Sequence, residues 1–514
     1  MGGILRNTFT VGSLTALSRV LGLAREMLQS RLIGAGVEQS AFTLAFAIPN
    51  MARKLFGEGA LTAAFVPVFK GEVERGDMES ARRLARAVMT TLLLLLGAAA
   101  ALAVVGLSAW LGWGRSLSPR MALTLRLVRI LFPYMVFICG AAFGMGILNA
   151  LGRFVEGAFM PSMLNVAWIA ALAAMCFFPG LSPATRVTVV CWAILAGGLA
   201  QMAFLFLCMA KRGFPPRFSG LGLDDPKVRL VWRNTAIAAF GAGAVQVNYM
   251  LDQVLAQLAS PWAAGVVGFA ERLMDLPLGV VGVAFGTVLL PAFAGRFATG
   301  DEAGARAALS SSFVQLSAVM LPAAAGMCLL APEITSVIYE GRAFDAVATV
   351  RVSRALAVYA LGLGFFGFQK IYVPWFQAQK DMKTPLRVSV ATVVLNAVLN
   401  VLAVVLLPVE WRHVGMAAST VVCAAAGCAL LAAAARRRNG TSGLRAAVSP
   451  VVRIAAASIA MAAVLAVVKP HLAGLSRCAA LAVLVAAGVA AYAASALALG
   501  LRSVLLARRH RAAH

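Results

Sequence analysis

Charged residues are scarce in this sequence, and acidic residues are scarcer than basic ones. Of the 514 residues only 13% are charged, with 20 aspartates and glutamates against 45 lysines and arginines. A soluble domain typically contains about 25% charged residues. No polar stretch here is long enough to form an ordinary soluble catalytic domain. The composition therefore excludes a large water-soluble enzyme.

The cysteine and histidine patterns that mark metal or redox sites are also missing. None of the eight cysteines has CxxC spacing, and the four histidines lie at the edges of predicted spans, in loops or in the C-terminal tail. Two acidic pairs, Asp224–Asp225 and Asp301–Glu302, could suggest a metal-dependent glycosyltransferase, but turns and helix starts use such pairs more often. We therefore predict no enzyme activity, no catalytic residue and no cofactor, apart from one ion considered below.

Long apolar runs dominate instead. The chain is 61% hydrophobic with a mean hydropathy of +0.87, and a helix that crosses a bilayer needs about 20 apolar residues. The runs predict an all-α polytopic membrane protein with fourteen transmembrane helices. The helix over 42–69 is expected to break or bend near Pro49. The other spans are expected at 8–34, 87–114, 130–152, 157–185, 187–210, 234–251, 253–295 with internal charges, 307–332, 355–369, 388–409, 413–435, 454–468 and 478–501.

The basic residues fall mainly in alternate connections between these spans. Examples are Arg82, Arg83, Lys211, Arg212 and Arg437. Such asymmetry marks the cytoplasmic side of a membrane protein, so both termini are expected in the cytoplasm. The net charge of +25 is then a signal of topology. Nucleic acid is not needed to explain it and is not a predicted partner.

The chain contains a weak internal repeat. Residues 65–82 align without a gap to 289–306, and Pro67, Phe69, Gly76 and Asp77 each recur in the second copy. In both copies the segment follows a helix that ends on the cytoplasmic side of the membrane. This shared orientation predicts two six-helix lobes related by a parallel repeat. Chance similarity of Gly-Asp turns is the alternative. The expected parts are an N-terminal lobe 1–212, a cytoplasmic linker 213–227, a C-terminal lobe 228–438 and a helix pair with a basic tail, 439–514. A second, weaker echo pairs Arg129 and Tyr134 with Arg354 and Tyr359.

Several charged residues lie inside predicted spans, where each would cost at least ~2.5 kcal/mol if it faced lipid. Internal salt bridges are one interpretation, because Arg272 and Asp275 have helical spacing. The basic residues inside the spans nevertheless outnumber the carboxylates, and the arginines cannot all be neutralised by the nearest ones. Because guanidinium binds phosphate through two hydrogen bonds and keeps its charge, this surplus predicts a cavity for a large anionic substrate.

A smaller polar set lies in the second lobe. Asn248 and Asp252 have i,i+4 spacing, as do Asn396 and Asn400, and Thr420 lies in the next predicted helix. One carboxylate with amide and hydroxyl oxygens could hold sodium. Interhelical hydrogen bonding is the alternative role for such residues.

Several motifs resemble those of one known family. They are SRVLGLARE (18–26), GAG (34–36), IPNMARKLFGEGALTAAFVPVF (48–69), GILNALGRF (146–154), ERLMDLPLGVVGVAFGTVLLP (271–291) and QKDMKTP (379–385). In this order they are similar to the MurJ (MviN) lipid II flippases of the multidrug/oligosaccharidyl-lipid/polysaccharide exporter superfamily. The resemblance implies fourteen helices, with the last two forming a groove for a polyprenyl tail.

The resemblance also implies site residues. The expected substrate-binding residues are Arg19, Arg25, Arg53, Arg272, Glu26, Asn50, Lys54, Glu58, Glu271 and Asp275. The expected sodium ligands are Asp252, Asn396, Asn400 and Thr420. Two positions depart from the family pattern: Ser40 stands where an acidic residue is frequent, and Asn400 where some members have aspartate. These departures weaken the case for a gate at Ser40 and for sodium dependence.

The expected function is transport alone. A lipid II flippase would move the undecaprenyl-pyrophosphate-linked peptidoglycan precursor from the inner to the outer leaflet of the bacterial cytoplasmic membrane by alternating access. Membrane lipids and cell-wall synthesis proteins would be its other partners. The alternatives are a flippase for another polyprenyl-linked glycan, a multidrug exporter and a membrane scaffold. A scaffold has no reason to bury a surplus of arginine, and an exporter of cations should have a surplus of carboxylate.

Overall fold

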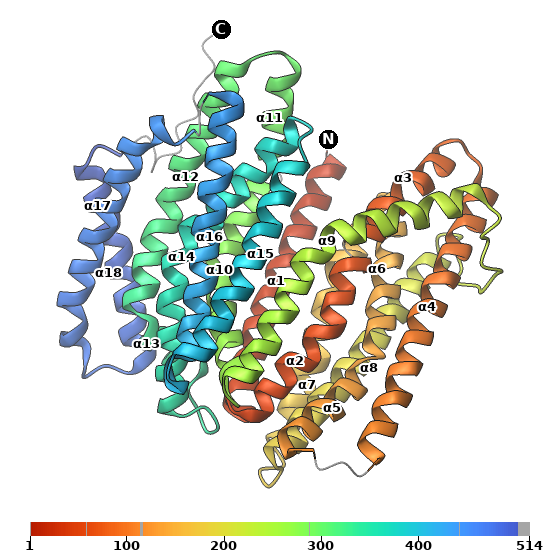
Figure 1. Ribbon diagram of the computed structural model, residues 1–514, viewed down its shortest axis with the longest axis horizontal. Coiled ribbons are helices and arrows are strands. Elements are labelled where there is room, and N and C mark those ends of the chain that lie inside the picture. The colour runs from red at the N-terminus through yellow and green to blue at the C-terminus, as the bar shows by residue number, and fades with distance from the viewer. Residues whose placement is uncertain (1, 58, 114–116, 287, 441–442, 502–514) are drawn as a thin grey trace. The chain divides into compact units, whose positions relative to one another are not determined.

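The computed structural model describes residues 2–57, 59–113, 117–286, 288–440 and 443–501, and within them every regular element is a helix (Figure 1). The helices are, in chain order, α1 (Gly2–Ile33), α2 (Val37–Ala52), α3 (Ala60–Glu74), α4 (Met78–Gly112), α5 (Pro119–Leu131), α6 (Tyr134–Ala150), α7 (Val155–Met175), α8 (Pro183–Ala210), α9 (Pro226–Ala259), α10 (Ala263–Gly286), α11 (Leu289–Ala298), α12 (Glu302–Leu329), α13 (Ala331–Tyr339), α14 (Ala346–Ala378), α15 (Lys383–Leu406), α16 (Val409–Asn439), α17 (Leu444–Val468) and α18 (Arg477–Ala498). The predicted all-α class is confirmed.

Ten helical segments in the described part of the chain are long and apolar enough to cross a membrane. They are α4, α5 with α6, α7, α8, α12, α14, α15, α16, α17 and α18. The remaining expected spans are also helical and correspond to α1, α2 with α3, α9, and α10 with α11. These helices contain most of the charges that the sequence places inside spans, which lowers their apolarity. The predicted count of fourteen is compatible with this arrangement.

Two expected span boundaries are wrong. The run 157–185 ends early, because α7 stops at Met175 and α8 begins anew after Ser182, whose side chain accepts the Thr185 N–H at 3.1 Å. The run that begins at 253 is divided, because α9 continues to Ala259 and α10 starts at Ala263. In both places the chain contains a proline or a capping serine that ends one helix and starts another. The expected spans are bounded by charged residues, and the residues between these helices carry no charge.

The expected break in the second span lies one turn after Pro49. Helix α2 continues through Pro49 to Ala52, and the N–H of Arg53 still contacts the carbonyl oxygens of Pro49 and Asn50. A π-helical turn, η1 (Arg53–Gly57), then precedes α3. Such turns widen the helix locally and frequently occur at functional sites.

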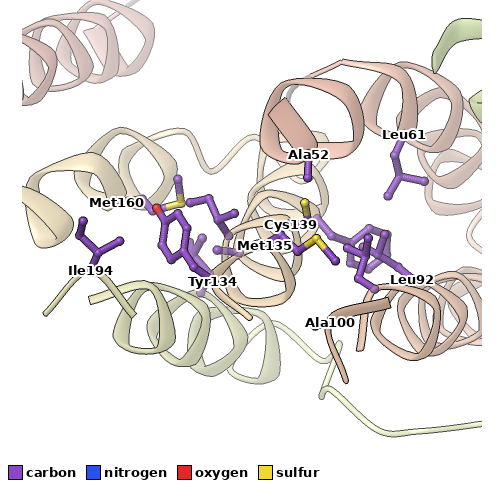
Figure 2. Packing of buried hydrophobic residues seen from close by; sticks show 14 of the residues in the cluster. Ala52, Leu61, Leu92, Ala100, Tyr134, Met135, Cys139, Met160 and Ile194 are labelled. Carbon is purple, nitrogen blue, oxygen red and sulfur yellow. The ribbon is translucent and has the colours of Figure 1, made fainter. Parts of the chain in front are cut away.

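The chain forms two compact units. The first consists of Met1–Gln257 with Gly341–Phe344, and the second of Leu258–Glu340 with Asp345–His514. In the first unit the core is built from large apolar side chains of α2 to α8, among them Phe42, Phe65 and Trp168, all at most 1% exposed. Figure 2 shows part of this core, where Met135 and Cys139 of α6 lie among side chains from neighbouring helices.

In the second unit α14 is the central helix and packs against α10, α12 and α16. Helix α17 packs on α12 and pairs with α18 (Figure 1). A small core of Met461, Leu465 and Leu484 joins this last pair to Leu330. The C-terminal helices are thus attached to the second unit through α12.

The two repeat segments adopt the same turn. Gly76 and Gly300 both have positive φ, +78° and +71°. The following aspartates begin a helix: Asp77 accepts the Ser80 N–H at 2.9 Å, and Asp301 accepts the Gly304 N–H at 2.8 Å. The shared Gly-Asp pair therefore has one local role in both copies, the end of one helix and the N-cap of the next.

Candidate functional site

Arg25 of α1 is the best-defined of the candidate arginines. It lies in the first unit, where α1 packs against α7. Its guanidinium donates to Glu26 and, through Nη1, to Oδ1 of Asn165 at 3.0 Å. The guanidinium carbon also lies 4.2 Å from the ring centroid of Trp168. Three different groups thus hold one planar cation in a fixed orientation.

The Arg25–Glu26 ion pair is shielded from solvent. The two side chains are 14% and 8% exposed. This is the internal salt bridge that the alternative interpretation of the charges predicts. Asn165 extends the network, because its Nδ2 donates to the backbone oxygen of Ser18 at 3.0 Å. The site residue Arg25 is therefore both a candidate ligand of an anion and a structural cation.

A second group lies at the π-helical turn. Arg53 donates through Nε and Nη2 to Oδ1 of Asn50, at 3.1 and 3.0 Å. Lys54 Nζ lies 4.9 Å from the ring centroid of Tyr249 on α9. Both cations are partly buried. The turn thus brings two predicted basic residues and Asn50 together, whereas Glu58 lies outside the described residues.

Arg19 occupies a different environment on α1. Its side chain is exposed, whereas Glu26, seven residues further along the same helix, is buried. The spacing places both residues on one face of the helix. Glu26 forms an ion pair with its direct neighbour Arg25.

In the second unit, the predicted charges of α10 are Glu271, Arg272 and Asp275. The hydroxyl of Tyr359 on α14 donates to Oε1 of Glu271 at 3.2 Å. Glu271 and Arg272 are partly buried and Asp275 is exposed. Glu271 thus contacts the same Tyr359 that appears in the second echo of the repeat.

The predicted sodium ligands are found on three helices. Nδ2 of Asn248 donates to Asp252 at 3.3 Å on α9, in the first unit. In the second unit Asn400 donates to Asn396 at 3.0 Å, and both are at least 97% buried. Thr420 donates its hydroxyl hydrogen to a backbone oxygen of its own helix at 3.2 Å, which leaves its oxygen lone pairs available. The donor set is oxygen-rich, as a hard cation requires. In the described residues, no group of three His, Cys, Asp or Glu side chains could hold a metal.

The sequence did not identify three residues that shape these groups. Asn165, Trp168 and Tyr249 contact predicted site residues but lie outside every charged motif. Of the three, Asn165 alone could have been noticed in the sequence, because it is a polar residue inside a run without charged residues. Its partner on α1 is 140 positions away, so no local pattern connects the two.

Ser40, where the family pattern has an acidic residue, is fully buried. Its backbone oxygen accepts a hydrogen bond from the side chain of Gln257. Arg120 in turn donates through Nε to Oε1 of Gln257 at 3.0 Å. Because the bond uses the main chain, it does not depend on which side chain occupies position 40.

Comparison with known proteins gives consistent matches over most of the chain. A family profile described as lipid II flippase MurJ matches residues 29–487. The probable lipid II flippase MurJ of Rhizobium tropici is 34% identical over 410 residues, which cover 78% of this chain and 75% of that protein. The lipid II flippase MurJ of Burkholderia cenocepacia is 32% identical over 427 residues, covering 81% and 80%.

Solved structures show the same fold. A lipid II flippase MurJ in an inward closed conformation superposes with a TM-score of 0.76 at 21% identity, covering 97% of this chain and 99% of that one. An inward-facing transporter of the multidrug resistance MATE family, in the MOP superfamily, superposes with a TM-score of 0.67 at 16% identity, covering 85% and 99%. At sequence identities of 21% and 16%, the similarity to these two structures concerns the fold.

Proposed function

This chain belongs to the lipid II flippase MurJ family, and we propose that it moves lipid II from the inner to the outer leaflet of the bacterial cytoplasmic membrane. The observation that carries the proposal is the family match over residues 29–487. Relatives more than 30% identical over about four-fifths of the chain bear the same name. Multiple apolar helices agree with a multi-pass inner-membrane transporter.

The candidate arginines would bind the pyrophosphate of the substrate. Arg19, Arg25 and Arg53 lie in the first unit and Arg272 in the second. A guanidinium presents a planar fork to phosphate oxygens and stays charged in a low dielectric. Glu26, Asn165 and Trp168 would act as positioning residues, because they fix the orientation of Arg25.

The alternatives have less support. A flippase for another polyprenyl-linked glycan would use the same pyrophosphate chemistry, but the relatives are named for lipid II. A multidrug exporter is favoured only by the fold it shares with the MATE transporter. We further propose that transport alone is the activity, with no covalent chemistry, and that membrane lipids and cell-wall synthesis proteins are the other partners.

Depletion of the protein should trap lipid II in the inner leaflet. In cells in which this chain is the sole flippase, we expect externally accessible lipid II to fall while total lipid II rises. The measurement is modification of lipid II by a membrane-impermeant reagent, followed by quantification of both pools. An accessible pool that stays constant while the protein disappears would contradict the proposed function.

The orientation that we propose places both termini in the cytoplasm. A cysteine at position 437, within a basic connection, should react only with a reagent present on the cytoplasmic side. A cysteine introduced in the connection 342–346 should react only from outside. Labelling of intact cells and of inverted vesicles measures both, and the reverse pattern would refute the orientation.

Sodium is the one ion that we propose as a coupling partner. Asp252 would supply the charge, and Asn396, Asn400 and Thr420 would supply neutral oxygens. We expect sodium to raise the apparent melting temperature of the purified protein, and Asp252→Asn to remove this increase without changing the melting temperature measured in potassium. Asn248→Ala, which removes a hydrogen bond to Asp252 but keeps the carboxylate, is the control. Equal stabilisation of parent and Asp252→Asn by sodium would leave hydrogen bonding as the role of these residues.

A further inference from the structure

The second unit contains an apolar groove that the transport residues do not use. It has a volume of about 660 Å³ and is lined by α12, α13, α14 and α17. Binding pockets for small molecules typically range from roughly 300 to 1,000 Å³. Its walls are mostly apolar, as Leu329, Pro332, Leu361 and Ala462 illustrate. The groove therefore has the size and character of a site for a hydrocarbon chain.

One cation lines this groove. Arg354 is exposed on α14, and its guanidinium carbon lies 4.7 Å from the ring centroid of Trp411. Trp411 lies in the first turn of α16 and is 47% exposed, a position typical of aromatic residues at the membrane interface. Arg354 thus lines the groove beside a tryptophan, an arrangement suited to an arginine whose apolar stem contacts hydrocarbon and whose charge contacts a lipid headgroup.

Arg354 differs from the basic residues around it in its ion pairing. In the part of the chain that the structure describes, Arg354 forms no ion pair with a carboxylate, whereas Arg351, one turn earlier, pairs with Glu410 at 3.3 Å. An adjoining pocket of about 570 Å³, which contains two cations and shares Pro332 with the groove, has a different charge state. Its cations are neutralised, because Lys469 pairs with Glu333 and Arg477 with Glu340, each at 2.8 Å. Arg354 is therefore the charge on this wall that is available to an external anion.

The choice of ligand follows from what a bilayer already provides. A hydrocarbon chain gains little from leaving lipid for an apolar groove, because both environments are apolar. Selectivity must then come from the headgroup, and an arginine near the membrane surface favours an anionic one. Phosphate is the lipid anion that guanidinium binds best.

We propose that this groove binds an anionic membrane phospholipid, with one acyl chain along α12, α14 and α17 and its phosphodiester on Arg354. The lipid comes from the leaflet that faces the connection between α13 and α14. None of the charged or amide residues proposed to bind lipid II lines this groove, but α17, one of the two helices that the family resemblance assigns to the polyprenyl tail, contributes Ala462. The inference does not require the proposed flippase activity, and the test below therefore compares the phospholipid with a polyprenyl pyrophosphate.

The native thiol of Cys328 provides a direct test, because Cys328 lines the groove. The full-length protein is placed in nanodiscs of phosphatidylcholine, with or without phosphatidylglycerol, and labelled with a lipophilic maleimide. We expect phosphatidylglycerol to slow labelling of Cys328 about fivefold, the effect of one basic residue on an anionic lipid near the membrane surface. The exposed Cys176, in the other unit, is the internal reference and should label at an unchanged rate.

Two variants separate the charge from the groove. Arg354→Gln should abolish the protection by phosphatidylglycerol, while Arg126→Gln, which removes an exposed charge from α5, should retain it. Ala357→Phe should fill the groove and make Cys328 labelling independent of lipid composition, at the slow rate. Protection that persists in Arg354→Gln would overturn the proposal. The proposal would also be overturned if phosphatidylcholine or inorganic phosphate protected Cys328 equally well. A polyprenyl pyrophosphate that protected Cys328 better than phosphatidylglycerol would overturn it too.

Discussion

Replacing Gly34 by alanine is expected to destabilise the first unit by roughly 3 kcal/mol, through backbone strain and a lost hydrogen bond. Gly34 follows α1 with φ +80°, a conformation that L-residues rarely adopt. A Cβ there would lie 2.2 Å from the carbonyl oxygen of Ala343. The same segment donates the Ala343 N–H to the backbone oxygen of Arg31 at 3.1 Å. Alanine at position 34 must therefore displace the segment 341–344 or unwind the end of α1.

Gly36→Ala provides a matched control within the same GAG motif. Gly36 has φ −83°, and a Cβ there would meet only Glu38 Oε2, at an ordinary 3.4 Å. Thermal unfolding in detergent should show a large decrease for Gly34→Ala and little change for Gly36→Ala. Equal melting temperatures for the two variants would show that the close approach of residue 343 does not contribute to stability.

Removing Arg25 is expected to abolish flipping and to reduce stability as well. Arg25→Ala would remove the ion pair that Arg25 forms with Glu26, which is 6% exposed. Breaking a buried pair in this way costs roughly 3–5 kcal/mol. Arg25→Lys keeps the charge but cannot present a planar fork to both Glu26 and Asn165, so we expect only partial rescue. Complementation of flippase-depleted cells and protein abundance are measured together.

A double variant separates the two roles of Arg25. Arg25→Ala with Glu26→Gln removes both charges of the buried ion pair, so abundance and thermal stability should return while complementation stays lost. Restored complementation in the double variant would show that Arg25 is only the partner of Glu26. Arg153→Ala is the control, because it breaks a partly exposed pair with Glu156 at 2.9 Å, a type of interaction worth about 0–1 kcal/mol.

The position of the segment 341–344 explains why Gly34 is sensitive. These four residues belong to the first unit, although α13 and α14 on either side belong to the second. Phe344 is fully buried and Gly341 lies against the side chain of Arg31. No periodicity or charge pattern in the sequence indicates this attachment, because a short connection carries no signal about a distant partner.

Neighbouring residues alone account for the local features of this protein, and these features can be predicted from the amino-acid sequence. The length of each apolar run decides whether it forms a membrane-spanning helix, and Gly76 with Asp77 decides where α3 ends and α4 begins. The charges inside the spans are equally visible in the sequence. Arg25 and Arg53 are therefore recognisable as candidate site residues from their positions within apolar segments.

Which side chains contact those charged residues depends instead on how whole helices pack together. Asn165 and Trp168 reach Arg25 because α7 packs against α1 in one particular rotation. An apolar helix such as α7 shows no polar and apolar faces in its sequence, so periodicity cannot give that rotation. The groove at Arg354 likewise depends on how α12, α14 and α17 pack together. Contacts between residues far apart in the chain arise from this packing, and a single sequence does not encode it as a local pattern.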